Sequence, residues 1–584
     1  MVMADSIESA DLVVIGAGWY GLSSAKTYIQ IHPTHKIIIL EASPSIGGVW
    51  CTSRLYPLLK SNNMVGTYEN PDFPMDEATW GIKPGSHIPG PVVHDYLTAF
   101  AKKFGMLERT RFNCRVESVE RGRDGWLLTK KLIVATGMTS QPSLPDFEGQ
   151  EDFGQPLFHS RDFVKHQETL QTVKRVTILG GTKSAWDPVY AYATNGVHVD
   201  WVIRESGHGP CWMSPPYVTP LKKWLEKLVH TRLLTWMSPC IWGAADGYGT
   251  IRSYLHGTAI GRVVVNTFWS ILNSDVAGLM KYDQHPETAK LKPWMEPFWT
   301  GNGLSIMNYP TDFLELVRSG KVKVHVADIV RLEEGKVVLS SGDVIETDAM
   351  LCATGWTHAS PVKFIPSTLE AEIGLPVLPS SQLPRMKAES DFLTTRADEE
   401  ILSKFPRLKN QPPGNMKFKP IPSAEKLIRN EKLSPIDLYR FMVPATEEMV
   451  ARRDIAFAGH FLTLTTTIAA QIQGLWIAAY FDGKIDPFAS SSPSSTSNTK
   501  FDIADLAYQT RLHNRFGKWR YPHGWAGQIP DFVFDGLPYV DLLLGDLGLV
   551  CRRKGGGWRE MTEPYGPEDY VGVVDEWIEK NGPK

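Results

Sequence analysis

The sequence predicts an α/β fold with two Rossmann-like, dinucleotide-binding domains, the second inserted into the first, followed by an aromatic-rich C-terminal extension. Three observations predict this. An apolar strand pattern, a glycine-rich turn and a helix follow one another near residue 12 and again near residue 176. A strand ending in Ala-Thr-Gly stands at 131–137 and returns at 348–355. The 584 residues also exceed what one hydrophobic core usually supports, so we expect several domains.

The first unit begins with the apolar run 12–15, a predicted buried strand. Gly16, Gly18 and Gly21 follow it in the G-x-G-x-x-G spacing, which permits a tight turn, close approach of a pyrophosphate and close packing of the next helix. The positive N-terminal end of that helix faces the phosphates. Glu41 follows the second predicted strand, where a carboxylate binds ribose hydroxyls and repels a 2′-phosphate. The unit is therefore predicted to bind FAD or NAD.

The second unit repeats this order with different side chains. Gly180, Thr182, Lys183 and Ser184 occupy the turn after a β-branched strand, and a helix is expected to follow. Arg204 ends the next strand, where Glu41 stands in the first unit, and its planar fork suits a 2′-phosphate. The unit is therefore predicted to bind NADPH. Thr182 replaces the second glycine of the fingerprint, so a plain βαβ unit without a nucleotide stays as an alternative.

The two Ala-Thr-Gly turns resemble those that mark the crossing between the nucleotide domains in dinucleotide flavoproteins, where small residues permit close passage beside cofactor; a plain strand-ending turn stays open for each. A Ser-rich segment then predicts a flexible linker. The predicted order is 1–170, first part of the FAD domain; 171–345, NADPH domain; 346–488, second part of the FAD domain; 489–500, linker; and 501–584, C-terminal extension.

Composition excludes several classes. The net charge is −3 and the charges are interspersed, so we expect no nucleic-acid partner. The six cysteines are scattered without a C-x-x-C pair, which excludes dithiol redox chemistry and favours a reducing compartment; we predict a cytoplasmic protein without a metal site. No signal peptide is legible. The apolar stretches 233–245 and 263–272 are too short or too polar to span a bilayer, and core packing, a substrate wall and peripheral membrane contact stay open for them.

Further motifs stand in a fixed order along the chain. They are Ile46-Gly47-Gly48-Val49-Trp50, Lys60-Ser61-Asn62-Asn63, Asp72-Phe73-Pro74, Phe158-His159-Ser160-Arg161-Asp162-Phe163, Ala353-Thr354-Gly355-Trp356 and Asp454 to Gly459. With the two glycine units, this set resembles the flavin-containing monooxygenases, in the wider group that includes Baeyer-Villiger and N-hydroxylating flavoprotein monooxygenases. The resemblance covers about residues 10–485.

The linker signature of that family, F-x-G-x-x-x-H-x-x-x-(Y/F), is stretched in this chain. Phe147, Gly149, His159 and Phe163 supply the residue types, but nine residues separate Gly149 from His159, which predicts an inserted loop. Phe163 stands where Baeyer-Villiger enzymes usually have Trp, which favours the flavin-containing monooxygenase type.

The resemblance implies site residues. Asn62 matches an asparagine that family members place near the flavin ring, and a turn role for it is equally open. Gly48 and Trp50 would line FAD, Thr354 and Gly355 would pass beside cofactor, and Asp454 would bind the ribityl side. An apolar helix from about residue 468 would face the flavin carbonyls with its N-terminus. His159 is expected to be structural rather than an acid or base.

The resemblance also implies the reaction. NADPH would reduce FAD, and O2 would add to the reduced ring to give a 4a-hydroperoxyflavin, which inserts one oxygen atom into a small organic substrate. We expect an apolar secondary metabolite, because flavin monooxygenases of fungal biosynthetic pathways have similar C-terminal extensions. Hydroxylation, epoxidation and heteroatom oxidation stay open, and Baeyer-Villiger insertion into a ketone is an alternative. A second alternative is a non-catalytic or NADPH-independent flavin-binding protein.

The remaining segments are less regular. Residues 205–300 are rich in Trp, Tyr, Pro and Gly, and predict a substrate wall or lid or an irregular surface insertion. Residues 371–420 mix Pro, Lys and Glu without periodicity, which predicts a loop-rich insertion. The extension is expected to dock on the body or cap the substrate entrance through aromatic side chains, namely Tyr508, Trp519, Tyr521, Trp525, Phe532, Phe534 and Tyr539.

Overall fold

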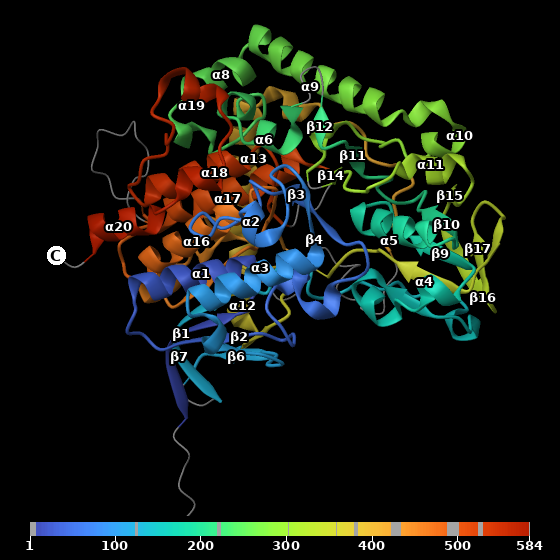
Figure 1. The fold of residues 1–584 in the computed structure, drawn as a ribbon. Helices are drawn as coiled ribbons and strands as arrows, with labels where there is room; N and C mark the ends of the chain where they lie inside the picture. Colours follow the sequence, from blue (N-terminus) through green and yellow to red (C-terminus); the bar gives the residue numbers. More distant parts are fainter. Residues whose placement is uncertain are drawn as a thin grey trace, which may run out of the picture.

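Two parallel β-sheets, each flanked by helices, organise the molecule (Figure 1). The computed structural model describes residues 7–122, 126–218, 223–301, 303–357, 359–378, 384–421, 434–487, 502–523 and 529–582. The predicted linker 489–500 and Trp525 lie outside these residues. Each sheet has five strands, and the strands of the second sheet lie between those of the first in the sequence.

The first sheet has the order β23-β7-β1-β2-β5. Its strands are β1 (Glu8–Ile15), β2 (Ile37–Leu40), β5 (Thr110–Arg111), β7 (Leu127–Val134) and β23 (Ile455–Phe457). Ile15 stands opposite Leu40 and Val134, and Phe457 also stands opposite Val134. The carboxyl ends of these strands therefore meet at one edge, where ligands bind in open parallel sheets. The predicted glycine turn begins at that edge.

The second sheet has the order β15-β10-β9-β19-β8. Its strands are β8 (Leu157–His159), β9 (Arg175–Leu179), β10 (His198–Ile203), β15 (Val322–Val326) and β19 (Ala349–Cys352). Strands β8 and β19 lie outside the range 171–345 that the sequence assigned to this domain. The predicted boundaries therefore differ from the extent of the observed sheet. Strands that are far apart in the sequence pair by hydrogen bonds, and local periodicity does not show which strands pair.

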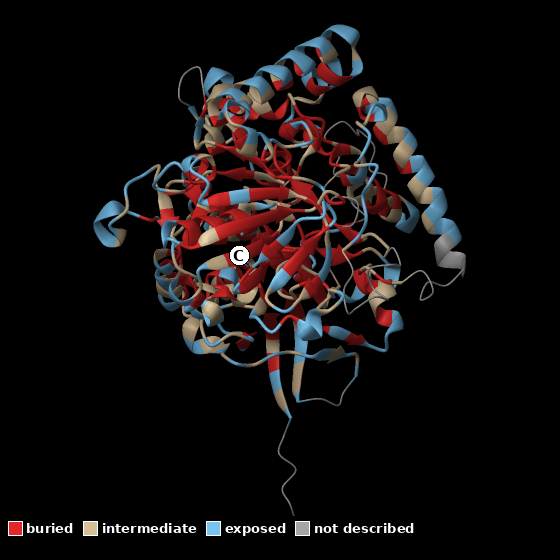
Figure 2. Cartoon of the chain, turned by 90° about the vertical axis from the view of Figure 1, so that its right-hand side faces the viewer, coloured by how far each residue is buried: buried red, intermediate tan, exposed pale blue. Residues whose placement is uncertain are grey.

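Helices α1 (Trp19–Ile31) and α16 (Thr466–Phe481) pack against each other over the first sheet. The predicted apolar helix near 468 is confirmed, and α16 is almost wholly buried. The buried residues gather between the sheets and these helices, and the exposed ones cover the outer helices (Figure 2). A helix that is apolar on all sides lies in a protein core, and α16 lies there.

Residues 205–300 fold mainly into helices: α6 (Leu225–Val229), α7 (Arg232–Thr235), α8 (Gly249–Gly257) and α9 (Ala259–Met280). Helix α9 runs along the apex in Figure 1. The insertion is thus more regular than its irregular aromatic pattern indicated. No helix among the described residues is long and apolar enough to cross a membrane.

The loop-rich expectation for 371–420 is wrong. The segment contains α12 (Thr368–Ile373) and the long helix α13 (Pro384–Lys404). Helix α13 packs on α17 (Ile503–Arg520) of the extension. Asp398 accepts hydrogen bonds from Arg515 at 2.7 Å and from Trp519 at 2.5 Å. Polar contacts between distant segments stabilise α13, and local apolar periodicity cannot reveal such contacts.

The C-terminal extension docks on the body, as predicted. Arg232 of α7 is fully buried, and its guanidinium lies 2.5 Å from the Asp541 carboxylate of α18 (Gly536–Asp546) and 3.0 Å from Glu560. The Tyr539 hydroxyl accepts a hydrogen bond from Gln473 of α16 at 2.8 Å. Removing one partner of a buried ion pair typically costs about 3–5 kcal/mol, so this contact holds insertion and extension together.

The extension also reaches back to the first βαβ unit. The backbone N–H of Gly572 donates to Asp72 at 2.9 Å, and Asp72 also pairs with the buried ammonium of Lys26 on α1. Helix α20 (Val573–Asn581) follows Gly572 and packs on α1. The C-terminal end of the described chain therefore packs on the first βαβ unit.

Candidate dinucleotide sites and the interdomain cleft

Two glycines of the first turn are required by the protein itself. Gly16 has a φ of +105°, and a Cβ there would lie 2.5 Å from the carbonyl oxygen of Ala135. A Cβ on Gly21 would lie 1.9 Å from the carbonyl oxygen of Gly16. Side chains at either position would clash with backbone, so these residues set the tight turn and the close approach of α1.

Gly18 is different, because nothing in the protein requires a glycine there. Its φ of −87° and ψ of −171° are open to any residue. The atom nearest to an added Cβ would be the Cα of Gly48 at 3.6 Å, an ordinary contact. Gly18 therefore leaves room at the helix N-terminus, which is where a pyrophosphate lies in a dinucleotide site.

Glu41 lies at the same edge and is buried. One carboxylate oxygen accepts the N–H of Ala17 and the other accepts the N–H of Ser43, both at 2.7 Å. Each oxygen keeps a second lone pair, so the carboxylate can still accept from ribose hydroxyls. The backbone contacts hold Glu41 against the turn, in the place that the sequence predicts.

Three buried polar atoms around this edge have no hydrogen-bond partner among the described residues: the Tyr20 hydroxyl, Thr136 Oγ1 and His460 Nδ1. Thr136 and His460 follow the carboxyl ends of β7 and β23. Burial lowers the pKa of His460 to about 4, so its imidazole is neutral. Unpaired buried groups cost about 1–3 kcal/mol each, which a polar ligand such as FAD would offset. The sequence reasoning did not find His460.

Asp454 lies away from this edge of the sheet, which corrects the prediction that it binds FAD. It precedes β23, and its carbonyl accepts the N–H of Leu132 near the amino end of the sheet. Its carboxylate pairs with Arg452 at 2.7 Å. Strand β23 runs from the amino edge to the carboxyl edge of the sheet, so only residues after Phe457 lie at the glycine turn. The FAD contact is therefore expected after the strand, whereas the prediction assigned it to the residue before the strand.

The second turn has the predicted strand and helix, β9 and α5 (Lys183–Thr194). Gly180 has a φ of +143°, and a Cβ there would lie 2.5 Å from the Ala353 carbonyl oxygen. Thr182 is extended and exposed, with no side-chain cap bond, and Ser184 is exposed as well. The turn therefore keeps polar side chains and the α5 N-terminus toward solvent, which fits a phosphate group less closely than the first turn does.

The chain itself crosses this second turn. A Cβ on Gly181 would lie 2.5 Å from the carbonyl oxygen of Gly209, and a Cβ on Gly209 would lie 2.4 Å from the Trp294 ring. The N–H of Cys211 donates to the carbonyl oxygen of Gly181 at 2.8 Å, as the N–H of Gly47 donates to the carbonyl oxygen of Ala17 at 2.9 Å in the first unit. A crossing segment therefore covers one side of both turns.

Arg204 is already engaged. Its guanidinium donates to Ser206 Oγ at 2.6 Å and to the carbonyl oxygen of Lys419 at 2.7 Å, and lies 3.5 Å from Asp328. Residues 415–419, which we call the strap, are fixed beside it by Asn415, whose amide donates to the carbonyl oxygens of residues 205 and 207 at 2.7 and 2.8 Å. A 2′-phosphate would share or displace the Lys419 carbonyl.

Lys183 of the second turn is engaged within its own helix rather than with Arg204. Its ammonium pairs with Asp187 one turn along α5 and lies 4.7 Å from the Tyr309 ring centroid. Tyr56 and Tyr309 donate to the same Asp187 carboxylate at 2.8 Å. A lysine at a helix start reaches the acid four residues later, and the sequence reasoning did not consider that local pair.

Asn62 lies in a strand, β3 (Lys60–Met64), rather than in a turn. Alternation places Ser61 and Asn63 on the buried face, and Asn63 donates to Glu226 and to the Leu464 carbonyl oxygen. Asn62 is half-buried, and its amide has no hydrogen bond to a described residue. Its amide is therefore free to bind a ligand.

Glu226 is a buried carboxyl that the sequence did not reveal. It lies on α6 and accepts from Thr67 Oγ1 at 2.6 Å, from the N–H of Met64 at 3.2 Å, and from Asn63. Burial raises its pKa to about 7, because these donors are all neutral. A glutamate among Leu and Lys on a short helix gives no sequence signal of burial.

The Ala353-Thr354-Gly355 turn joins two segments instead of standing free beside cofactor. Thr354 Oγ1 donates to the Ser143 carbonyl oxygen at 2.6 Å. His159 Nε2 donates to the Gly355 carbonyl oxygen at 3.0 Å, and His159 Nδ1 accepts the N–H of Arg161 at 3.1 Å. Burial lowers the pKa of His159 to about 4. Both ring nitrogens are used, so the expected structural role of His159 fits.

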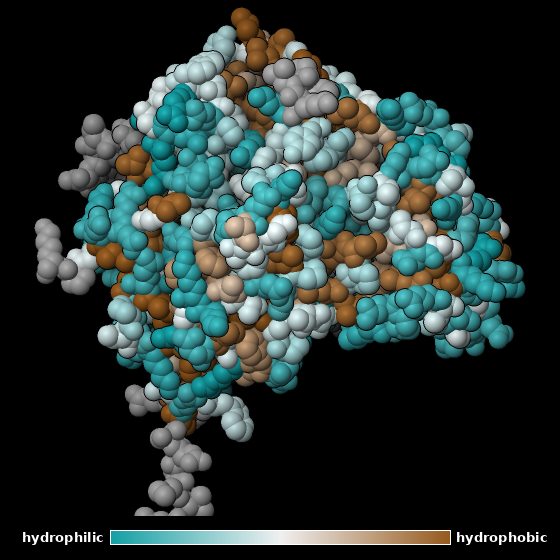
Figure 3. Space-filling view, viewed as in Figure 1, coloured by the Kyte–Doolittle hydropathy of each residue, from teal (hydrophilic) through white to brown (hydrophobic). Residues whose placement is uncertain are grey.

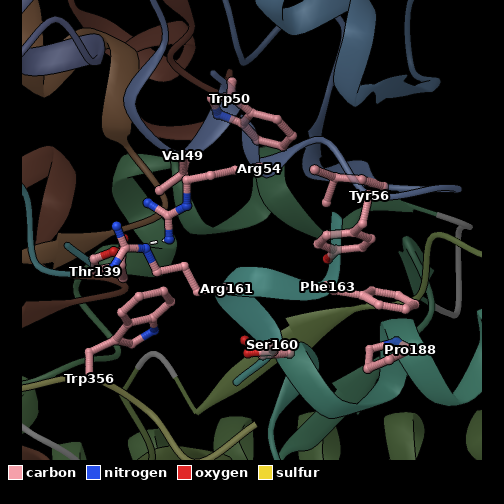
Figure 4. A pocket seen from close by; sticks show the side chains of 12 residues that line it. Val49, Trp50, Arg54, Tyr56, Thr139, Ser160, Arg161, Phe163, Pro188 and Trp356 are labelled. Atoms are coloured by element: carbon pink, nitrogen blue, oxygen red, sulfur yellow. Dashed lines mark hydrogen bonds between the residues drawn. The ribbon is translucent and has the colours of Figure 1, made fainter. Parts of the chain in front are cut away.

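A cleft opens where the two nucleotide units meet (Figure 4). The first unit supplies Val49, Trp50, Arg54, Tyr56 and Leu59, the linking segments supply Thr139, Ser160, Arg161, Phe163 and Trp356, and α5 supplies Ser184 and Pro188. Trp50 and Ser184 were predicted site residues, and the cleft brings these two together. No cluster of metal-ligating side chains occurs among the residues that the structure covers.

Comparisons with known proteins agree with this architecture. A family model described as pyridine nucleotide-disulphide oxidoreductase matches residues 13–233. An FAD-dependent monooxygenase of Aspergillus nomiae is 33% identical over 604 residues, covering 98% of this chain and 99% of that protein. An FAD-dependent monooxygenase of Pyrenophora dematioidea is 34% identical over 573 residues, covering 93% and 98%.

Among solved structures, a cyclohexanone monooxygenase from Rhodococcus sp. Phi1, bound to NADP+, aligns with a TM-score of 0.56 and 15% identity. The alignment covers 93% of this chain and 98% of that one. At this identity the likeness concerns the fold.

Proposed function

The chain belongs to the FAD-dependent monooxygenase family, and from this premise we propose that it uses NADPH and O2 to oxygenate a small organic substrate. The observation that best supports the cofactor assignment is the turn with Gly16 and Gly18 at the N-terminus of α1, with Glu41 held against it by a backbone hydrogen bond. A secondary metabolite is the proposed substrate, which fits the fungal origin of the full-length relatives.

The first unit would hold FAD. Gly16, Gly18 and Gly48 leave room for the pyrophosphate, and Glu41 accepts from the ribose. His460 replaces Asp454 in this assignment, because its unpaired Nδ1 lies at the nucleotide edge. Bound flavin supplies redox chemistry and the activation of O2. The protein positions the substrate and excludes water.

The second unit would hold NADPH. The N-terminus of α5 with Gly180, Thr182 and Ser184 faces the pyrophosphate, and Arg204 binds the 2′-phosphate after the strap yields its carbonyl. Lys183 positions α5 through Asp187 and is no longer assigned to the phosphate. The strand, turn and helix order of this unit, with Arg204 after the next strand, supports the proposal.

Asn62 is proposed to bind the reacting end of the cofactors. Its amide is free and half-buried, whereas Ser61 and Asn63 on the opposite face are used by the fold. Hydroxylation, epoxidation and heteroatom oxidation are the proposed reactions, with Baeyer-Villiger insertion as the alternative. Phe163, which stacks on Tyr192 at 5.4 Å between centroids, lines the cleft that decides between them.

The proposed domain division follows the sheets. The FAD domain comprises residues up to about 140 and again from about 357 to 487, and the NADPH domain comprises the intervening residues. In this division β8 and β19 join the NADPH domain, and the Ala-Thr-Gly turns stand at the crossings.

The test is anaerobic stopped-flow absorbance of the purified protein with NADPH, then with O2. We expect rapid bleaching of the flavin near 450 nm on the order of seconds or faster, and recovery with O2 through an intermediate that absorbs in the near ultraviolet. A yellow protein that NADPH leaves oxidised would favour the non-catalytic alternative, in which the crossed second turn no longer admits the nucleotide.

We also propose peripheral membrane contact through α8 and α9. Ile260, Val263 and Ile271 of α9 are 68%, 63% and 63% exposed, and apolar residues gather at this apex (Figure 3). Residues 247–274 contain no Asp or Glu, and Arg262 borders the face. A convex apolar ridge without carboxylates fits an anionic lipid surface.

Co-sedimentation with phosphatidylcholine vesicles containing one-fifth phosphatidylserine tests this face. We expect the wild type to pellet and the Ile260→Asp/Val264→Asp variant to stay in the supernatant. Val330→Asp/Val344→Asp, a pair of exposed valines elsewhere, should pellet as the wild type does. Equal behaviour of the first variant and the wild type, or a wild-type dimer that this variant abolishes, would reject the lipid proposal.

A further inference from the structure

Two guanidinium groups in the interdomain cleft lack a carboxylate partner. Arg54 donates to the Thr139 carbonyl oxygen at 3.0 Å and lies 5.0 Å from the Trp356 ring centroid. Arg161 makes no side-chain hydrogen bond to a described residue. Within the described chain, neither guanidinium has an Asp or Glu oxygen within 4.0 Å. In Figure 4 the two groups lie next to each other above Trp356.

Placing two like charges together in a partly buried cleft is unfavourable. Burial lowers the pKa of Arg54 to about 10, and the charge of Arg161 contributes to this shift. The neighbouring carboxylate of Asp162 is directed to Lys165, 2.8 Å away. A bound anion would relieve the repulsion, and guanidinium forks bind oxyanions through two parallel hydrogen bonds.

The arginines are held in place by other side chains. His159 accepts the backbone N–H of Arg161 at 3.1 Å and donates to Gly355, the residue before Trp356. The His159 ring also packs edge-on against Trp356 at 5.1 Å. One buried, neutral histidine therefore holds the backbone of Arg161 and also packs against the Trp356 ring, on which the Arg54 guanidinium lies. Such preorganisation lowers the entropic cost of binding.

Apart from Thr139, Ser160 and Ser184, the rest of the cleft lining is apolar or aromatic. Trp50, Tyr56, Phe163 and Pro188 line it, and the Tyr56 hydroxyl is directed to Asp187 at 2.8 Å instead of into the cleft. A ligand that fills this space has an aromatic or aliphatic body and places its charge beside the arginines. This differs from the wholly apolar substrate that the sequence predicted.

We propose that Arg54 and Arg161 form an oxyanion-binding site for a carboxylate or ionised enol of the substrate. The same chemistry would accept a phosphate oxygen of the nicotinamide cofactor, because Ser184 of the second turn lines the cleft as well. The proposal rests on the proposed function for its substrate assignment, but the binding of an anion requires neither NADPH nor turnover.

The experiment is a titration of the FAD-loaded protein without NADPH, followed by tryptophan fluorescence and the visible flavin spectrum. Trp50 and Trp356 report on the cleft. The probes are benzoate, benzyl alcohol as the neutral molecule of similar size, and inorganic pyrophosphate. We expect benzoate to bind at least about tenfold more tightly than benzyl alcohol, which corresponds to roughly 1.4 kcal/mol.

Variants assign the effect to the cleft. Arg161→Gln should abolish the preference for benzoate over benzyl alcohol, and Arg161→Lys should retain most of it. Arg331→Gln, at an exposed arginine of β16 (Ile329–Glu333) that pairs with Glu333 at 2.6 Å, should bind as the wild type does.

Equal affinities for benzoate and benzyl alcohol, or an Arg161→Gln variant that binds like the wild type, would overturn the anion site. Binding of pyrophosphate without binding of benzoate would overturn the substrate assignment and give the site to the cofactor. A protein that binds benzoate through Arg161 but is not bleached by NADPH would keep this proposal while the proposed function fails.

Discussion

The two nucleotide units share a strand, a turn and a helix but differ in what surrounds the turn. At the first turn, an added Cβ on Gly18 would make only an ordinary contact with Gly48, and three buried polar atoms have no partner among the described residues. At the second turn, Gly209 crosses beside Gly181, and the strap binds Arg204. We propose that the first is a preformed ligand site, whereas the second must exchange the contacts between Arg204 and the strap for ligand contacts. The same local motif thus predicts different binding energies.

The largest expected effect is at Gly18. Gly18→Thr gives the first turn the residue of the second, and its Cβ and backbone fit the protein. We expect at least about 100-fold weaker FAD binding, or roughly 2.7 kcal/mol, and a colourless protein. Flavin content and the circular dichroism of the apoprotein are the measurements.

Gly21→Ala serves as the contrast, since its Cβ would meet backbone at 1.9 Å and should reduce the yield of folded protein. If Gly18→Thr instead purifies yellow with full flavin content, the first turn is not the pyrophosphate site.

A pH measurement separates two buried carboxyls, one near each unit. Asp200 of the second sheet lies 2.9 Å from His325 and 3.1 Å from Arg175. Burial raises the pKa of Asp200, but the hydrogen bonds from these two groups lower it by more, so the pKa is lowered overall. Glu226 has only neutral donors, and its pKa is raised to about 7. Between its usual pKa and 7, the folded state binds more protons than the unfolded state, so stability falls as pH rises.

We therefore expect the free energy of unfolding to fall between pH 5 and pH 7 more steeply in the wild type than in Glu226→Gln. The contribution of Glu226 is at most about 3 kcal/mol over this range. Urea denaturation at both pH values gives the difference. Parallel pH profiles of the wild type and the variant would mean that Glu226 stays ionised in both states.

The Arg204→Gln variant tests the second site. We expect the KM for NADPH to rise about tenfold, or roughly 1.4 kcal/mol, with the KM for NADH unchanged. This loss is smaller than for an arginine without other partners, because the phosphate would replace the existing hydrogen bonds from the Arg204 guanidinium to Lys419 and Ser206. Steady-state kinetics with both nucleotides decide, and an unchanged KM for NADPH would remove Arg204 from the site.

The smallest effect is expected from Thr182→Gly, which restores the fingerprint glycine. The pyrophosphate could approach more closely, but Gly209 still crosses the turn. We expect NADPH to bind about threefold more tightly, a gain of roughly 0.7 kcal/mol. Isothermal titration with NADP+ measures it. Weaker binding would show that the Thr182 hydroxyl itself contacts the cofactor.

Local periodicity predicted much of the fold, including both βαβ units and α16, because strand and helix patterns are written in adjacent residues. It failed where stability comes from distant contacts. Helix α13 depends on Arg515 and Trp519, more than 100 residues away. Asp454 was misplaced because a motif gives the order of residues but not the edge of the sheet to which each belongs.

The candidate site was predictable in part for a similar reason. Gly16, Gly18 and Glu41 are recognised by spacing alone, and they lie together at one edge. Arg161 stands in one of the motifs and Arg54 lies between two of them, yet only the folded chain shows that they face the same space. The sequence does not show that Asp162, next to Arg161, pairs with Lys165 and leaves both guanidinium groups without a carboxylate among the described residues.

The contact of Gly572 with Asp72 has a consequence for biosynthesis. The two residues are separated by 500 positions, and Asp72 also holds Lys26 of the first helix. At roughly 5–20 residues per second, at least about 25 seconds pass between the synthesis of the two partners. The first βαβ unit also waits for β23. Throughout that interval the nascent chain presents an incomplete sheet edge, so heterologous production should benefit from abundant chaperones.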